Sequence, residues 1–171
     1  MKRTHDLFYL HEDNLQVKDS FVEVANAIGD SFDGSIADVG CATGAFPNYL
    51  YSRFPKAEVF GIEYLESLLA KAKEDFPHIN FLKGDVTQQS SVNEKFDVIT
   101  MLGVLCIFDD YASVLENVLS WLKPNGRFVM HNMISDFDVD IFIKYKPSSK
   151  HFKSEELESG WNIISKKSLQ L

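Results

Sequence analysis

The chain has 171 residues, of which 45% are hydrophobic and 25% charged, and its formal net charge is −8. This length and composition predict one globular domain with a sizeable buried core. The acidic balance argues against a large nucleic-acid or anionic-membrane footprint.

The cysteines and the hydropathy of the chain indicate the cellular compartment that we expect for it. Cys41 and Cys106 belong to no C-x-x-C motif and no Cys/His cluster, so neither a disulfide framework nor a metal site is predicted. No apolar run reaches about 18 residues, and the N-terminus lacks the apolar centre of a signal peptide. We therefore expect a cytoplasmic protein without a membrane-spanning segment.

Helical and strand-like segments alternate along most of the chain. After an N-terminal stretch without clear periodicity, apolar spacing predicts helices at about 19–28, 45–53, 65–76 and 111–122. Short apolar runs predict strands at 36–39, 57–63, 79–82, 96–102 and 128–130, with a turn at 123–126. The polar stretch 87–95 is a loop or a short helix. This order predicts an α/β fold, a doubly wound, mostly parallel sheet with helices on both faces.

The alternation of predicted strands and helices ends after Ile134. Apolar residues alternate with polar ones from Phe137 to Ile143, which predicts a strand, and Pro147 to Ser149 would turn it. The segment 161–164 could pair back with that strand, and 165–171 is typical of a helix start of about one turn. We expect one domain with an N-terminal segment and candidate lid at 1–34, a core at 35–134, and a substrate cap or subunit contact at 135–171.

The stretch from Ser35 to Gly44, Ser-Ile-Ala-Asp-Val-Gly-Cys-Ala-Thr-Gly, predicts a strand, a tight glycine turn and the start of a helix. Such a turn presents backbone N–H groups and a helix N-terminus to a ligand. Gly40 allows the turn, and Gly44 allows close approach of a ligand to the backbone. The spacing is G-x-x-x-G, because Ala42 replaces the second glycine of the dinucleotide-binding pattern, and no Gly-Lys-Ser/Thr follows as a P-loop requires.

The segment Asp38 to Gly44 resembles the first motif of the class I S-adenosylmethionine-dependent methyltransferases. Further matches follow in order: Glu63 after the second strand, Gly84-Asp85 after the third, Leu102-Gly103 after the fourth, and Lys123 to Arg127 before the fifth. These matches cover roughly residues 35–131. The resemblance implies a Rossmann-like methyltransferase fold and S-adenosylmethionine as cofactor, with S-adenosylhomocysteine as product.

The resemblance also implies which residues would bind the cofactor. Glu63 would accept hydrogen bonds from both ribose hydroxyls, Tyr64 and Leu65 would pack on the adenine, and Asp85 would accept from the adenine amino group. The Val86 N–H would face a ring nitrogen, and Leu102 and Gly103 would line the methyl-donor and substrate side. The expected cofactor-binding residues are therefore Asp38, Gly40, Cys41, Ala42, Gly44, Glu63, Tyr64, Leu65, Asp85, Val86, Leu102 and Gly103.

Methyl transfer from a sulfonium is an in-line displacement, so positioning can lower much of its barrier without a dedicated base. If a base exists, His131 at the end of the fifth strand is best placed, because imidazole titrates near neutrality. His5, Tyr9 and His11 could belong to a lid over the cofactor. The expected acceptor is a small molecule rather than nucleic acid, since the fourth strand lacks the Asn/Asp-Pro-Pro-Tyr/Phe motif of amino-directed nucleic-acid enzymes. A homodimer is compatible with the apolar residues between Phe137 and Trp161.

One departure from the family pattern keeps alternatives open. The closing antiparallel pair of strands is not found before Leu171, which predicts a truncated chain or one without these strands. A methyltransferase-like binding module without catalysis would fit that loss. An NAD-dependent oxidoreductase would need the missing second glycine, and an aminopropyl transferase would be expected to carry paired acids in place of Leu102-Gly103.

Overall fold

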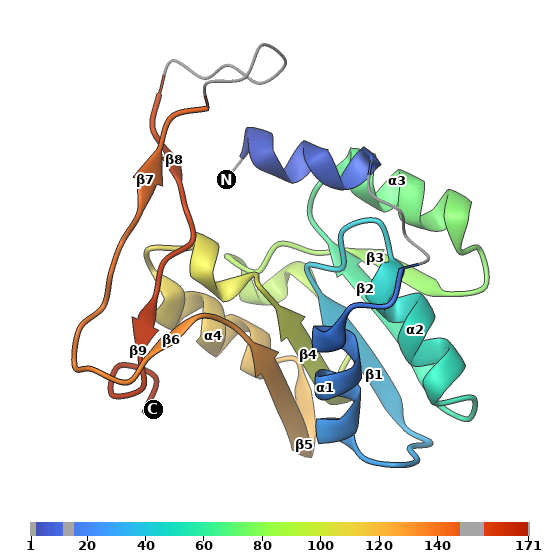
Figure 1. Cartoon of the computed structure of the whole chain (residues 1–171). Helices are drawn as coiled ribbons and strands as arrows, with labels where there is room; N and C mark the ends of the chain where they lie inside the picture. The colour runs from blue at the N-terminus through green and yellow to red at the C-terminus, as the bar shows by residue number, and fades with distance from the viewer. Residues whose placement is uncertain (1–2, 12–15, 148–155, 171) are drawn as a thin grey trace.

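A computed structural model describes residues 3–11, 16–147 and 156–170. Its centre is a five-stranded parallel sheet with the strand order β3-β2-β1-β4-β5 (Figure 1). The strands are β1 (Ser35–Val39), β2 (Glu58–Glu63), β3 (Asn80–Lys83), β4 (Phe96–Leu102) and β5 (Leu122–His131). The predicted doubly wound α/β fold is confirmed.

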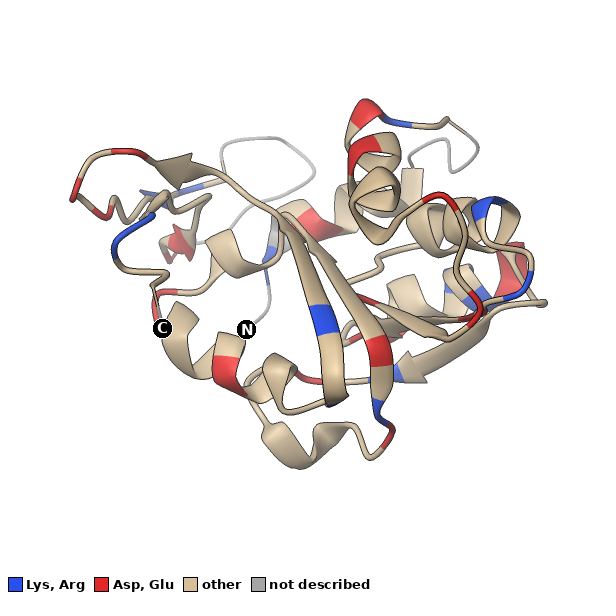
Figure 2. Ribbon diagram, turned by 90° about the horizontal axis from the view of Figure 1, so that it is seen from below, with Lys and Arg blue, Asp and Glu red and all other residues tan. Residues whose placement is uncertain are grey.

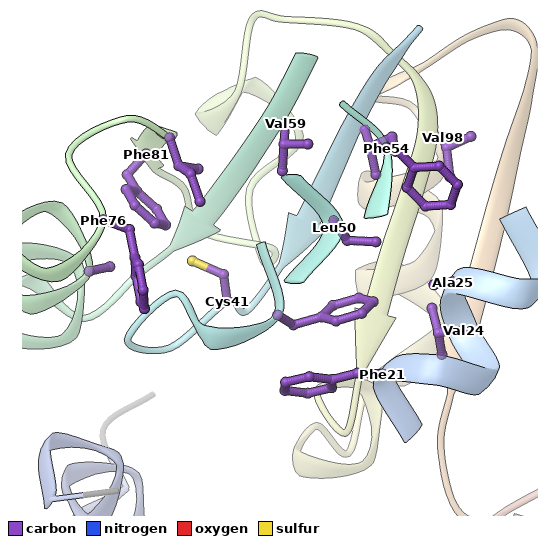
Figure 3. Packing of buried hydrophobic residues seen from close by; sticks show 14 of the residues in the cluster. Phe21, Val24, Ala25, Cys41, Leu50, Phe54, Val59, Phe76, Phe81 and Val98 are labelled. Atoms are coloured by element: carbon purple, nitrogen blue, oxygen red, sulfur yellow. The ribbon is translucent and has the colours of Figure 1, made fainter. Parts of the chain in front are cut away.

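Helices cover both faces of the sheet. The helices α1 (Asp19–Ile28), α2 (Ala45–Arg53) and α3 (Glu66–Asp75) contribute to one apolar cluster, and α4 (Tyr111–Leu119) contributes to the other. Figure 3 shows the first cluster, in which Phe21, Val24 and Ala25 of α1 lie near Leu50 and Phe54. Every residue of β1 is buried, because a parallel sheet covered on both faces exposes neither.

Side chains of β1 point alternately to the two faces of the sheet, so this one strand contributes to both apolar clusters. Ile36 packs in the cluster of α1 and α2, whereas Ala37 and Val39 pack in the cluster of α4. Successive side chains of a strand point to opposite faces of the sheet. Asp38 therefore shares the face of Ile36, at the carboxyl end of the strand.

The predicted boundary between the last helix of the core and β5 needs correction. The helix α4 ends at Leu119 rather than near Leu122, and the predicted turn at 123–126 lies within β5. Trp121 is fully buried and donates its indole N–H to the carbonyl oxygen of Gln89 over 2.8 Å. The pairing with β4 is irregular between Phe96 and Val98, and Asn125 has a φ of 64°. The strand thus absorbs the turn as a bulge instead of beginning after it.

The described residues also form three 3₁₀-helices, namely η1 (Thr4–His11), η2 (Gln89–Ser91) and η3 (Leu105–Ile107). The periodicity of the sequence did not predict η1, which Figure 1 shows running from the β7–β8 hairpin to α3. A 3₁₀-helix repeats every three residues, so the helical spacing used for the other predictions does not detect it. The short helix η2 lies in the polar stretch for which a loop or short helix was predicted.

The C-terminal segment pairs mainly with itself. The strand β6 (Ile134–Ser135) runs parallel to β9 (Ile164–Ser165), and β7 (Lys144–Tyr145) is antiparallel to β8 (Glu158–Ser159). An isolated antiparallel bridge joins Ile141 to Ile163. The predicted pairing of the two halves is therefore confirmed, but most of 137–143 is not a strand.

Two further C-terminal predictions can be compared with the structure. The predicted turn at 147–149 falls largely outside the described residues. The predicted helix start is a single turn, in which the Leu169 N–H donates to the Ser165 carbonyl over 3.2 Å. In the described parts of the chain, the five-stranded sheet has no antiparallel closing pair.

The structure also shows how charged residues are distributed and whether any described helix could span a membrane. Figure 2 shows acidic and basic residues scattered over helices, strands and loops rather than gathered on one element in that view. Within 3–11, 16–147 and 156–170, no helix combines the length and apolar character needed to cross a bilayer.

Candidate functional site

A cavity of about 320 Å³ lies at the carboxyl ends of the central strands. The chain adds β2 and β3 on one side of β1 and then crosses to add β4 and β5 on the other. Doubly wound sheets bind ligands at such a point of reversal, because the loops that follow the two strands diverge there.

The cavity brings together most of the residues predicted from the sequence. Its lining includes Asp38, Gly40, Cys41, Ala42, Glu63, Tyr64, Leu65, Asp85, Val86, Leu102, Gly103 and His131. These residues lie at the carboxyl ends of the five parallel strands or shortly after them, so parallel topology places them at one edge of the sheet. Their contact with a cofactor stays a prediction.

The turn after β1 owes its shape to one close packing contact and two hydrogen bonds. Gly40 has a φ of 75°, and a Cβ on it would lie 2.2 Å from Cγ2 of Val104. The N–H groups of Gly40 and Cys41 both donate to the Ile62 carbonyl, over 2.8 and 3.1 Å. Only glycine combines this left-handed conformation with such a close neighbour. These two hydrogen bonds therefore attach the turn to β2.

Gly44 is not among the residues that line the cavity. It has a φ of 88° and precedes α2, and its N–H donates to the Cys41 carbonyl over 2.9 Å. A Cβ at Gly44 would meet Phe81 at 2.7 Å and Phe76 at 3.0 Å. The space that we expected a ligand to approach is thus filled by aromatic rings of the core. The requirement for glycine here comes from backbone conformation and packing.

Glu63 is held by backbone donors from both sides. Its Oε2 accepts from the Ala42 N–H over 3.0 Å, and its Oε1 accepts from the Leu65 N–H over 2.8 Å. The side chain is only 7% exposed, and burial raises the pKa of Glu63 even though these N–H bonds lower it. Each carboxylate oxygen has a second lone pair, so a fixed carboxylate faces the cavity with acceptor capacity to spare.

Asp38 is buried with a single hydroxyl partner. Thr100 is its neighbour on β4 in the parallel register, and the Thr100 Oγ1 donates to Asp38 Oδ1 over 2.8 Å. Burial raises the pKa of Asp38 to about 8, and the charge of Glu63 contributes to the rise. At neutral pH this carboxyl is therefore mostly protonated and can donate as well as accept a hydrogen bond.

Asp85 is engaged mainly by its own loop. Its Oδ1 accepts from both the N–H and the hydroxyl of Thr87, over 2.9 and 2.7 Å. Its Oδ2 accepts from the Gln88 amide over 3.2 Å, and its N–H donates to the Ser91 hydroxyl. These bonds hold the loop after β3 in shape beside the cavity, which Asp85 lines together with Val86.

Sequence reasoning missed several residues at the cavity. Arg3, Lys18, Phe21 and Trp161 line it although they are distant in sequence from the glycine turn. His5 and Tyr9 of the expected lid also line it, but His11 does not. Thr100 could have been noticed as a polar residue inside an apolar strand. The segments containing Arg3 and Trp161 carry no motif.

The described residues contain no group of three or more His, Cys, Asp or Glu side chains placed to hold a metal ion. His131 lies at the end of β5, where its carbonyl accepts from the Gly103 N–H over 2.8 Å. The candidate base thus stands next to Gly103, whose missing Cβ would meet nothing within 4 Å. This is open space at the cavity edge.

Comparison with known proteins agrees with this geometry. The model of the methyltransferase domain family matches residues 36–126, from β1 to the bulge of β5. The chain is 25% identical over 140 residues to malonyl-[acyl-carrier protein] O-methyltransferase of Halalkalibacterium halodurans, covering 77% of this chain and 51% of that one. It is 31% identical over 91 residues to trans-aconitate 2-methyltransferase of Yersinia pestis, covering 53% and 35%.

A solved structure supports the fold as well. A TehB-like SAM-dependent methyltransferase from Corynebacterium glutamicum is similar with a TM-score of 0.55 and 24% identity, over 74% of this chain and 66% of that one. The chain spans about half or less of the length of the two curated relatives. The fold, the glycine turn at the point of strand reversal and the family match together show that this chain belongs to the class I S-adenosylmethionine-dependent methyltransferases.

Proposed function

We propose that this chain binds S-adenosylmethionine in the cavity and transfers its methyl group to a small-molecule acceptor. The observation that carries the proposal is the Glu63 carboxylate. It is fixed between the N–H groups of the glycine turn and of the α3 start, and it retains lone pairs toward the cavity. A ribose diol needs such a doubly accepting and rigid carboxylate.

The remaining lining fits the other parts of the cofactor. Leu65, Leu68 and Val86 offer apolar surface beside Asp85, which suits an adenine ring. The open space at Gly103 leaves room for the amino-acid tail or the methyl group. When bound, the cofactor supplies an electrophilic methyl group on a sulfonium leaving group. The residues of this chain position the reactants and exclude water, which suffices for much of the barrier in a displacement of this kind.

The acceptor is proposed from the relatives and the size of the cavity. The two curated relatives act on malonyl-acyl-carrier protein and on trans-aconitate. A cavity of about 320 Å³ that also holds the cofactor leaves room for a small group only. His131 is the proposed base if the acceptor must lose a proton, and His131→Gln would then lower turnover at least about a hundredfold.

Titration calorimetry with S-adenosylhomocysteine tests the proposed site. Glu63→Gln replaces one acceptor oxygen by a donor that faces a backbone N–H. We therefore expect affinity to fall by about 1–3 kcal/mol, which is roughly 5- to 150-fold. Glu66→Gln is the matched control, because Glu66 is exposed on the first turn of α3 and pairs with Lys83.

Control ligands distinguish a methyltransferase from an NAD-dependent oxidoreductase and from a non-catalytic binding module. S-adenosylmethionine and S-adenosylhomocysteine should both bind the wild-type chain, and NAD should not. Binding of NAD alone would favour the oxidoreductase alternative. Binding of both sulfur ligands without methyl transfer to any acceptor would favour the non-catalytic module.

A further inference from the structure

Arg3 is a buried charged residue at the cavity to which the proposed cofactor site assigns no role. Its side chain is 2% exposed, and it lines the cavity. Its Nη1 lies 3.3 Å from Oδ1 of Asp6, and the guanidinium stands over the ring of Trp161 at 4.9 Å. Within the described residues, its Nε and Nη2 are buried and have no hydrogen-bond partner.

The two unpartnered nitrogens have a specific chemical meaning. Nε and Nη2 lie along one edge of the planar guanidinium, and that edge receives a carboxylate side-on through two parallel hydrogen bonds. Leaving two buried donors unsatisfied costs free energy, and a ligand with two coplanar acceptor oxygens removes that cost.

The neighbouring carboxylates are occupied elsewhere. Asp6 faces Nη1 rather than the free edge. Glu158 accepts from the Tyr145 hydroxyl over 3.0 Å, and Tyr145 stacks on Trp161 with 5.5 Å between ring centroids. The free edge of Arg3 is therefore the part of this cluster that still requires an acceptor.

The position of Arg3 along the sheet indicates which ligand it meets. Glu63 and Asp85 follow β2 and β3, on one side of β1. Trp161 lies on the other side, because the next residue, Asn162, donates its N–H to the Cys106 carbonyl of η3, directly after β4. Figure 1 likewise shows the start of η1 near the C-terminal hairpin and its end near α3.

We propose that the Nε–Nη2 edge of Arg3 binds a carboxylate of the methyl acceptor, with Trp161 and His5 as the wall of this subsite. This inference rests on the proposed function. The rings of His5 and Trp161 meet edge to face with centroids 4.7 Å apart, so the N-terminal and C-terminal segments build the subsite together. A carboxylate held by two N–H groups is a poor nucleophile. The acceptor therefore carries a second group that receives the methyl.

The experiment measures binding of carboxylate probes to the protein saturated with S-adenosylhomocysteine. The probes are benzoate and short mono- and dicarboxylates, each paired with its uncharged amide. We expect at least one acid to bind about tenfold or more tightly than its amide, and Arg3→Gln to abolish that preference. Arg3→Lys should retain part of it, because lysine keeps the charge but loses the two-donor edge.

Matched controls exclude a loss of folding and a role toward the cofactor. Arg53→Gln removes another guanidinium that stacks on a ring, Phe54, outside the cavity, and should leave the preference unchanged. The cofactor also carries a carboxylate, so S-adenosylhomocysteine is compared with 5′-methylthioadenosine, which has none. We expect Arg3→Gln to leave both affinities unchanged.

Three outcomes would overturn the proposal, and they differ from one another. Weaker binding of S-adenosylhomocysteine but not of 5′-methylthioadenosine to Arg3→Gln would assign Arg3 to the cofactor instead. An acid and amide that bind the wild-type protein equally well throughout the panel would remove the carboxylate subsite alone. No binding of S-adenosylhomocysteine to the wild-type protein would remove the proposed function together with this inference.

Discussion

Two buried carboxyl groups at the carboxyl ends of neighbouring strands differ in the hydrogen-bond donors that oppose the effect of burial on their pKa. Glu63 accepts two backbone N–H groups, which favour its ionised form and partly offset burial. Asp38 has one hydroxyl partner, and burial dominates, so the pKa of Asp38 rises to about 8. Burial raises the pKa of both carboxyl groups, and the donors around each of them oppose that rise.

Asp38→Asn tests this difference through the pH dependence of stability. In the unfolded chain the carboxyl ionises near pH 3.8, whereas in the folded protein it retains its proton up to about pH 8. The free energy of unfolding therefore falls as pH rises through this window. Asparagine still accepts from Thr100 but never ionises, so its advantage should grow from nothing near pH 4 to on the order of a few kcal/mol at pH 8. Urea unfolding across this range measures it.

Asp97→Asn is the control of opposite sign. The Lys123 ammonium and the Ser35 N–H and hydroxyl lower the pKa of Asp97 to about 2. Its contribution to stability is therefore present above pH 4 and is lost as pH falls toward 2. This variant should lose stability at neutral pH and not at acidic pH. Equal pH profiles for the Asp38 variant and the wild-type chain would contradict our account of Asp38.

At the scale of elements, three glycines with positive φ surround the site, but for different reasons. Gly40 must avoid Val104, Gly44 must avoid Phe81 and Phe76, and Gly103 has open space where its Cβ would stand. The turn after β1 is thus a packed unit with β2 and the loop after β4. These contacts and the hydrogen bonds to the Ile62 carbonyl shape the turn.

Gly40→Ala should destabilise the protein more than Gly103→Ala does. Both variants place an alanine in the left-handed region, at a cost of about 1–2 kcal/mol. Only Gly40→Ala also forces a methyl group against Val104, which adds about 1–3 kcal/mol. Denaturant unfolding measures both, and Val104→Ala in the Gly40→Ala background should restore the second part. Equal losses for the two glycine variants would show that the turn adjusts freely.

At the scale of the whole molecule, one sheet separates two apolar clusters. Leu50 of α2 is fully buried in one cluster, and Leu115 of α4 is buried in the other. The sheet connects the two clusters, since β1 contributes Ile36 to one of them and Ala37 and Val39 to the other. We therefore expect the two clusters to unfold together.

Leu50→Ala and Leu115→Ala should each cost about 2–5 kcal/mol, since each leaves a cavity in a packed interior. Their effects should add in the double variant to within about 0.5 kcal/mol, because Leu50 and Leu115 belong to separate apolar clusters. Thermal and urea unfolding of the four proteins check this. Two separate transitions in any of them would mean that the clusters unfold independently.

Features that depend on nearby residues could be predicted without the structure. Helix and strand periodicity, the glycine turn and the residues at strand ends are local patterns, and parallel topology necessarily brings those strand ends together. The fold, the family and the gathering of these strand-end residues around one cavity could therefore be predicted. The role of Gly44 was misjudged because its neighbours, Phe76 and Phe81, come from later elements.

Only the tertiary structure decided what depends on distant contacts. Burial makes Asp38 hold its proton, the pairing with β4 turns the 123–126 segment into a bulge of β5, and packing joins Arg3 to Trp161. None of these follows from spacing, because desolvation and side-chain contact are properties of the assembled chain. The segments that carry Arg3 and Trp161 lie outside the family match, so their place at the cavity is visible only once the chain has folded.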